Sequence, residues 1–334
     1  MEPWSLNEEE YKILLSYIGC GEIPKADILI FGNEEGTGGY SVTANVKART
    51  QLFGRDEISG SIKHCIEENN WREGFYQPDA QTGGKLVEQF LLPHEKKHLN
   101  DFTGGVFNAA IARLCLASER SGEDNWFQGS ANTTAFNTIK EYIRQNLYKP
   151  RTEGIQTALL DWRPLPRLTE SRWYTIEYGA VALSPENKPN QENPYLAVFN
   201  KPKAKYNPKR YSTSGFSDFK EDMEFRTRII KNALIKSDAQ ILLGIGGAGG
   251  FKKDALELMF GSNIFTPVPF SCDMRNSKGQ LQKAFQANVP LQNKHLHIFL
   301  IPFPSAGQGF VSQQNALSML EELSIKMNKI LLTK

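Results

Sequence analysis

The sequence places two adjacent carboxylates on a glycine-rich segment, Gly32-Asn33-Glu34-Glu35-Gly36, directly after a short apolar run. Glycine allows the backbone to approach a ligand closely, and a positioned carboxylate can orient a water molecule or accept a proton. The same residue types are also typical of an acidic turn that is exposed to solvent. The segment alone therefore leaves two interpretations open, a catalytic carboxylate and a solvated turn.

A further carboxylate, Asp161, follows another apolar run and is itself followed by Trp162, Arg163 and Pro164. A carboxylate at a strand end can accept hydrogen bonds from an amino group, and the indole of Trp162 offers a surface on which a ring can stack. The alternative is an ion pair between Asp161 and Arg163 on the surface, with Trp162 in the core.

A third segment, Gly244-Ile245-Gly246-Gly247-Ala248-Gly249, has the pattern G-x-G-x-x-G between an apolar run and a helical pattern. This pattern is typical of dinucleotide binding, and Asp273 lies further on, near where an acidic ribose ligand could sit. A glycine-rich turn followed by Lys252 and Lys253 serves equally well to hold a nucleic-acid phosphate against backbone amides. The last segment, Phe303-Pro304-Ser305-Ala306-Gly307, combines a stiff turn with a hydroxyl group.

Strands and helices in alternation must position these segments. Short apolar runs bounded by glycine or proline predict buried strands, and apolar residues that recur every three to four positions predict helices. The alternation predicts a three-layer α/β/α sandwich with a central, mainly parallel sheet, in which ligands bind beyond the carboxyl ends of the strands. The predicted strands cover 26–31, 157–160, 239–243 and 295–301, with one or two edge strands in 173–183, and the clearest predicted helices cover 104–119, 132–147, 219–236, 251–260 and 312–330.

We predict a single domain over residues 1–334, with a mainly helical insertion at 54–150 and an irregular basic insertion at 184–217. The capping pattern Ser5-Leu6-Asn7-Glu8 begins the first helix, which is expected to end near Gly19. In the second insertion, Lys205, Lys209 and Arg210 are interleaved with tyrosines and have no acidic neighbours, which suits contacts with phosphates. The alternative is a lysine-rich loop that is simply solvated.

The overall composition limits the class of protein. Hydrophobic residues make up 40% of the chain and charged residues 23%, which are ordinary globular values. Lys and Arg number 39 against 37 Asp and Glu, so any anionic partner must be bound by a local patch. The four cysteines lack metal-ligand spacing and are expected to be buried, reduced thiols. With no leader-like N-terminus and no apolar run of about 18 residues, we expect a cytoplasmic protein without a membrane partner.

Taken in order, the four segments resemble the motifs of the uracil-DNA glycosylase superfamily. That family has a first motif G-x-[D/N]-P-G or G-E-A-P-G, a strand that ends in an asparagine which reads the base, a strand that ends in glycine, and a last motif H-P-S or N-P-S. The counterparts in this chain are Gly32-Asn33-Glu34-Glu35-Gly36, Leu160-Asp161-Trp162-Arg163-Pro164, Leu243-Gly244 and Phe303-Pro304-Ser305. The resemblance spans most of the chain and implies a glycosylase-like fold with a DNA substrate.

The chain departs from the family at three positions. Glu35 replaces the proline of the first motif, Phe303 stands in place of His or Asn, and Asp161 stands in place of the base-reading asparagine. An ionised carboxylate only accepts hydrogen bonds, so Asp161 suits the exocyclic amino group of cytosine and repels the uracil carbonyl. With its glycine-rich first motif and its insertions, the chain resembles the prokaryotic antiviral glycosylases that excise glucosylated hydroxymethylcytosine from phage DNA.

The resemblance implies a monofunctional DNA glycosylase that flips out a modified base and hydrolyses its N-glycosidic bond, without a lyase step, metal ion, cofactor or obligate protein partner. Glu34 is the first choice for the group that orients water, with Asn33 and Glu35 as neighbours that could share or replace it. Base contacts are assigned to Asp161, Tyr40, Trp162 and Phe303, and DNA contacts to Ser305, Gly246, Lys252, Lys205, Lys209 and Arg210.

Three other interpretations stay open: a repair glycosylase for uracil-type bases, a nucleotide- or dinucleotide-binding protein that uses the loop 244–249, and a DNA-binding relative without catalytic activity.

Overall fold

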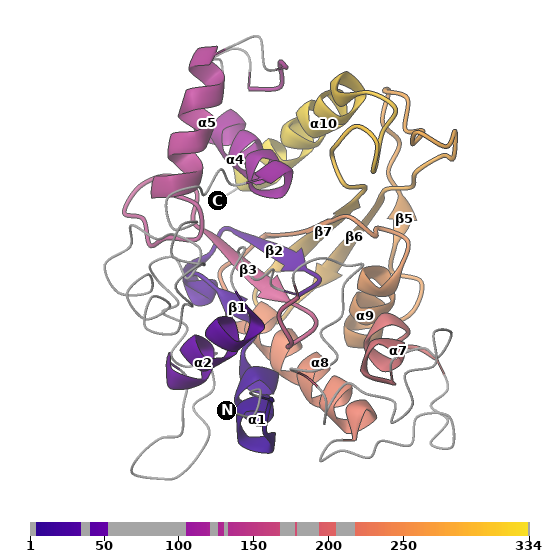
Figure 1. The fold of residues 1–334 in the computed structure, drawn as a ribbon. Coiled ribbons are helices and arrows are strands. Elements are labelled where there is room, and N and C mark those ends of the chain that lie inside the picture. The colour runs from indigo at the N-terminus through magenta and orange to yellow at the C-terminus, as the bar shows by residue number, and fades with distance from the viewer. Residues whose placement is uncertain are drawn as a thin grey trace. The chain divides into compact units, whose positions relative to one another are not determined.

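The computed structural model describes residues 5–34, 41–52, 105–120, 126–129, 133–167, 178, 194–204 and 218–332. Among these residues the fold is α/β, with several helices and a sheet of seven strands in the order β1-β3-β2-β4-β7-β6-β5 (Figure 1). The strands are β1 (Gly19–Cys20), β2 (Ile28–Gly32), β3 (Thr157–Asp161), β4 (Ile241–Ile245), β5 (Thr266–Pro267), β6 (Phe285–Pro290) and β7 (His295–Ile301). The predicted α/β class and all four predicted apolar strands are therefore confirmed.

The sheet is mostly parallel. β4 pairs in parallel with β2 on one side and with β7 on the other, whereas β6 runs antiparallel to both β7 and β5. β2, β3 and β4 are buried at every residue, as expected of strands that are covered on both faces. β6 alternates between more and less exposed residues and is interrupted by polar side chains, so it gave no continuous apolar run in the sequence.

Helices form where the apolar repeats predict them. The described helices are α1 (Glu8–Ser16), α2 (Val42–Leu52), α4 (Gly105–Glu119), α5 (Thr133–Gln145), α7 (Pro194–Asn200), α8 (Phe219–Lys236), α9 (Phe251–Phe260) and α10 (Gln313–Leu331), with a 3₁₀ turn at Ile23–Lys25. The cap of α1 differs from the prediction: Asn7, not Ser5, accepts from the backbone N–H of Glu10, and the Glu10 carboxylate accepts from the backbone N–H of Asn7.

The contacts within the chain define two compact units. Unit 1 comprises Met1–Cys20, Gly32–Phe102 and Leu160–Ala233, and unit 2 comprises Gly21–Phe31, Thr103–Leu159 and Leu234–Lys334. In unit 1, α1 packs against α2, and the Tyr11 hydroxyl donates to Asp222 over 2.8 Å. In unit 2, α4 packs against both α5 and α10, and Figure 1 shows these three helices on one face of the strands and α9 on the other.

The two predicted insertions are described only in part. Within 54–150 the described residues include the helices α4 and α5. Within 184–217 the prediction of irregular structure is wrong for Pro194–Asn200, which form α7. Proline is compatible with the first position of a helix, because its missing N–H has no partner there in any case. The predicted edge strands at 173–183 lie outside the described residues except for Tyr178, which is in a turn.

Two of the four cysteines match the prediction of buried free thiols. Cys20 and Cys115 are buried and free, Cys272 is free but only partly buried, and Cys65 lies outside the described residues. Burial raises the pKa of the Cys115 thiol to about 12, so this group stays protonated and unreactive at neutral pH. No helix in the described part of the chain is both long and apolar enough to span a membrane.

Candidate active site

The segments that follow β2 and β3 lie side by side in unit 1. The backbone N–H of Trp162 donates to the carbonyl of Gly32 over 3.3 Å, and that of Arg163 donates to the carbonyl of Asn33 over 2.7 Å. These bonds continue the pairing of the two strands beyond their carboxyl ends. They bring the first predicted motif next to the residues that follow Asp161, at the edge where ligands bind in sheets of this kind.

Glu34 is held between two arginines at this edge. Its Oε2 atom lies 2.6 Å from Nε of Arg163, and its Oε1 atom lies 2.9 Å from Nε of Arg167. The three side chains are only 4 to 6% exposed, so the interpretation of Glu34 as part of a solvated turn is wrong. Each of the two guanidinium groups therefore contacts a different oxygen of the Glu34 carboxylate.

Arg163 has a further partner that fixes its direction. Its Nη1 donates to the side-chain oxygen of Asn200 at the end of α7, over 3.0 Å. The predicted alternative of a surface pair between Asp161 and Arg163 is therefore wrong, because Arg163 is buried and pairs with Glu34. Sequence reasoning missed Arg163 and Arg167 as partners of Glu34. The available signal was two basic residues directly after a strand whose end faces the first motif.

Asp161 and Trp162 are both buried. Asp161 is 2% exposed at the end of β3. Trp162 has no exposed surface, its indole N–H donates to the carbonyl of Phe199 over 2.8 Å, and its ring meets that of Phe199 edge to face. The prediction that Trp162 stacks on a base is therefore wrong in this structure, and the alternative core position is confirmed. A large aromatic ring next to a buried strand fills the core more favourably than it would cover a site.

Arg226 of α8 is a buried residue that the sequence prediction missed. Its guanidinium donates to four backbone carbonyls: Trp162 over 3.2 Å, Leu15 over 3.0 Å, and those of Tyr17 and Asp161. Leu15 lies in the last turn of α1 and Tyr17 follows the end of that helix. Asp161 is the last residue of β3, and Trp162 follows it. Arg226 therefore fixes the backbone that carries Asp161. The only signal in the sequence is a charged residue on the apolar stripe of α8.

The loops after β4 and β7 in unit 2 lie against each other. The backbone N–H of Gly246 donates to the carbonyl of Ile301 over 2.9 Å, and a Cβ atom placed on Gly246 would lie 3.6 Å from the Phe303 ring. Gly246 has a φ of +76°, a conformation that favours glycine. Ser305 is 9% exposed, and its carbonyl accepts from Gly309 and Phe310. Three predicted site residues, Gly246, Phe303 and Ser305, thus belong to adjoining loops.

Lys252 does not occupy the position that a phosphate contact requires. Its side chain is 1% exposed, and its ammonium group donates to the carbonyl of Ile245 at the end of β4. The prediction that Lys252 contacts DNA is therefore wrong in this structure, because the group already satisfies a buried backbone oxygen. The neighbouring Lys253 is partly exposed and pairs with Glu257 over 2.8 Å.

The geometry after β4 weighs against the dinucleotide-binding interpretation. In such folds an acidic residue at the end of the next strand binds the ribose. Asp273 instead lies in a loop outside the strands, is exposed, and pairs with Arg275 over 3.3 Å. Asp273 therefore does not supply the acidic partner that this interpretation expects.

The remaining predicted site residues are Glu35, Tyr40, Lys205, Lys209 and Arg210, which all lie outside the described residues. Within the described ranges, no three His, Cys, Asp or Glu side chains group as a metal site would require. Comparisons with protein-family models, with curated proteins and with solved structures gave no match to the chain.

Proposed function

We propose that the chain is a monofunctional DNA glycosylase that hydrolyses the N-glycosidic bond of a flipped-out cytosine derivative, such as glucosylated hydroxymethylcytosine in phage DNA, as part of antiviral defence. The observation that carries the proposal is the meeting of Asn33 and Glu34 with the segment of Asp161 at the carboxyl ends of β2 and β3. The four-motif resemblance supports the same reaction.

Asp161 supplies base selection in this proposal. It is buried, and inside a protein a hydrogen bond between a carboxylate and an exocyclic amino group is stronger than in water. The O4 carbonyl of uracil would instead face a carboxylate that cannot donate. The site therefore favours a base that carries an amino group at this edge.

Glu34 supplies the fixed negative group near the sugar. Cleavage of the glycosidic bond develops positive charge on the sugar, and a carboxylate stabilises that charge and orients water at C1′. The two arginines hold the two carboxylate oxygens in place, and a positioned carboxylate can orient a water molecule. We therefore assign Glu34 the role of orienting water at C1′.

The reaction is tested with duplex oligonucleotides that carry uracil, cytosine, hydroxymethylcytosine or glucosylated hydroxymethylcytosine, followed by alkali to cleave abasic sites. We expect strand breaks at the glucosylated base and at least tenfold fewer at cytosine and uracil. If none of the four substrates gives strand breaks, the proposed reaction is overturned. Breaks at uracil alone would retain the reaction class and overturn the role of Asp161.

A substitution at Asp161 tests base selection directly. Asp161→Asn keeps the size of the side chain and adds a donor, so excision of the cytosine derivative should fall about 10- to 100-fold, as expected for one base contact worth 1–3 kcal/mol. Excision of uracil relative to the cytosine derivative should rise. The measurement is the ratio of single-turnover rates on the two oligonucleotides, and an unchanged ratio would contradict the assignment.

A further inference from the structure

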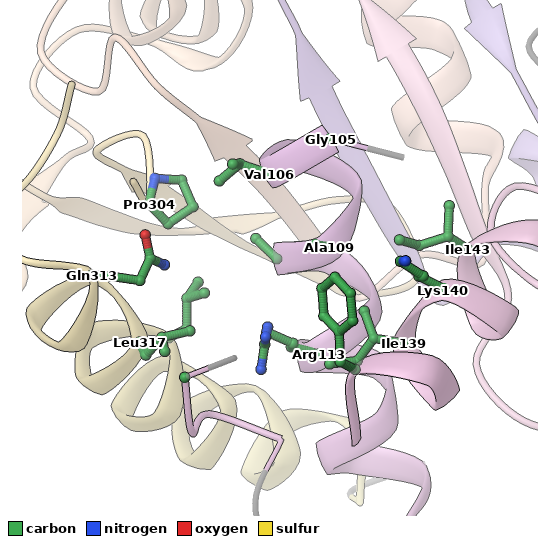
Figure 2. A pocket seen from close by; sticks show the side chains of 14 residues that line it. Gly105, Val106, Ala109, Arg113, Ile139, Lys140, Ile143, Pro304, Gln313 and Leu317 are labelled. Atoms are coloured by element: carbon green, nitrogen blue, oxygen red, sulfur yellow. The ribbon is translucent and has the colours of Figure 1, made fainter. Parts of the chain in front are cut away.

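A pocket of about 420 Å³ lies in unit 2, within the range of small-molecule sites. Figure 2 shows Gln313 and Leu317 of α10 on one side and Ile139 and Ile143 of α5 on the other, with α4 between them. Pro304 of the last motif lines it, but none of the residues assigned to catalysis or to base or DNA contacts does.

The wall of the pocket is mainly aliphatic. It is formed by alanine, valine, isoleucine, leucine and proline side chains, with one phenylalanine: Val106, Ala109, Ala110, Phe136, Ile139, Ile143, Pro304, Leu317 and Leu320. Val106 is 43% exposed and Phe136 is 40% exposed, so apolar surface reaches the solvent here. A hydrocarbon chain in this pocket would gain about 25 cal/mol for each Å² of apolar surface removed from water.

The described residues that line the pocket include two cations, Arg113 and Lys140, and no acidic residue. Arg113 is partly buried on α4, and its Nη1 donates to the backbone carbonyls of Trp126 and Gln128. Burial lowers the pKa of the Arg113 guanidinium, because the charged form loses its hydration. The Lys140 ammonium lies 4.5 Å from the centre of the Phe136 ring. Within the described part of the chain, neither cation pairs with a carboxylate.

We propose that this pocket binds an aliphatic carboxylate, with the hydrocarbon chain between α4, α5 and α10 and the carboxylate at Arg113. The remaining N–H groups of the guanidinium match a carboxylate, and Lys140 adds a second positive charge. A nucleotide fits this lining less well, because a base and a ribose need several polar partners and Gln313 supplies the only side-chain amide among the described lining residues. The proposal does not depend on the glycosylase activity.

Titration calorimetry with laurate and dodecyltrimethylammonium below their micelle concentrations, and with dodecanol below its solubility limit, tests this site on the full chain. We expect one molecule of laurate to bind per chain with a Kd on the order of 10 μM. The uncharged dodecanol and the cationic dodecyltrimethylammonium should each bind at least tenfold more weakly. Ala109→Phe, which fills the pocket, should abolish laurate binding. Arg113→Met should weaken it at least tenfold.

Two controls separate the site from general effects. Arg144→Met removes an exposed cation from α5 outside the pocket and should leave the Kd for laurate unchanged. Lys140→Met, at an exposed position, should weaken laurate about threefold without unfolding the chain, and it decides the charge argument if Arg113→Met fails to fold. Laurate binding that is absent, equal to that of dodecanol, or unaffected by Ala109→Phe would overturn the proposal.

Discussion

Glu34→Gln is expected to lower the rate of base excision about 10²- to 10⁴-fold, the range for loss of a positioned catalytic group. Glutamine has nearly the shape of glutamate but no charge to stabilise the sugar cation. The substitution also leaves the guanidinium groups of Arg163 and Arg167 without their buried counter-charge. Loss of one partner of a buried ion pair costs about 3–5 kcal/mol, so the free energy of unfolding should fall as well.

The matched control separates the two effects. Arg167→Gln breaks one of the two ion pairs and leaves Glu34 held by Arg163 over 2.6 Å. It should lower the free energy of unfolding but keep excision within about tenfold of the original rate, because the carboxylate remains. Both variants are compared by urea unfolding and by single-turnover excision at a temperature where each is folded. If Glu34→Gln is folded and excises at the original rate, Glu34 is only structural.

Arg226→Met is expected to lower the free energy of unfolding by about 3–5 kcal/mol, the range for the loss of a buried charged partner. The variant leaves four carbonyls, including those of Asp161 and Trp162, without this donor. Each buried polar group that loses its partner costs about 1–3 kcal/mol, partly recovered by rearrangement. The measurement is the urea unfolding midpoint and slope, followed by tryptophan fluorescence.

Arg228→Met on the same helix is the control for Arg226→Met. Arg228 is exposed and its guanidinium lies 5.4 Å from the centre of the Phe225 ring, so its replacement should lower the free energy of unfolding by no more than about 1 kcal/mol. Arg226→Lys retains a charge and up to three donors but lacks the planar fork, and should be intermediate between Arg226→Met and the original chain. A loss below about 1 kcal/mol in Arg226→Met would contradict the role of Arg226 as the residue that fixes the end of β3.

The elements of the fold follow from local patterns, and most of them are predictable from the sequence. The strands β2, β3, β4 and β7 are apolar runs with sharp glycine or proline boundaries, and α9 forms over the predicted residues. Short or alternating strands such as β5 and β6 carry no such signal. The pairing order of the strands depends on contacts between distant segments, which a local pattern does not encode.

The candidate site is predictable in its carboxylates but not in their partners. Glu34 and Asp161 are found because they follow strands, and parallel strands bring their ends to one edge. Whether a neighbouring side chain points into the core depends on contacts with distant segments, which a local sequence pattern does not encode. The polar groups of Trp162 and Lys252 donate to backbone carbonyls of Phe199 and Ile245, which the sequence does not reveal. Two of the four carbonyls that Arg226 contacts lie more than two hundred positions away.

The release of the free base is the most direct measurement of the proposed reaction. Phage DNA that contains glucosylated hydroxymethylcytosine is incubated with the protein, and the small molecules are identified by mass spectrometry while abasic sites are counted on the DNA. We predict the intact glucosylated base in solution and one abasic site for each base released, with both signals lost in Glu34→Gln. Free glucose or nucleotides without abasic sites, or no product at all, would contradict the account.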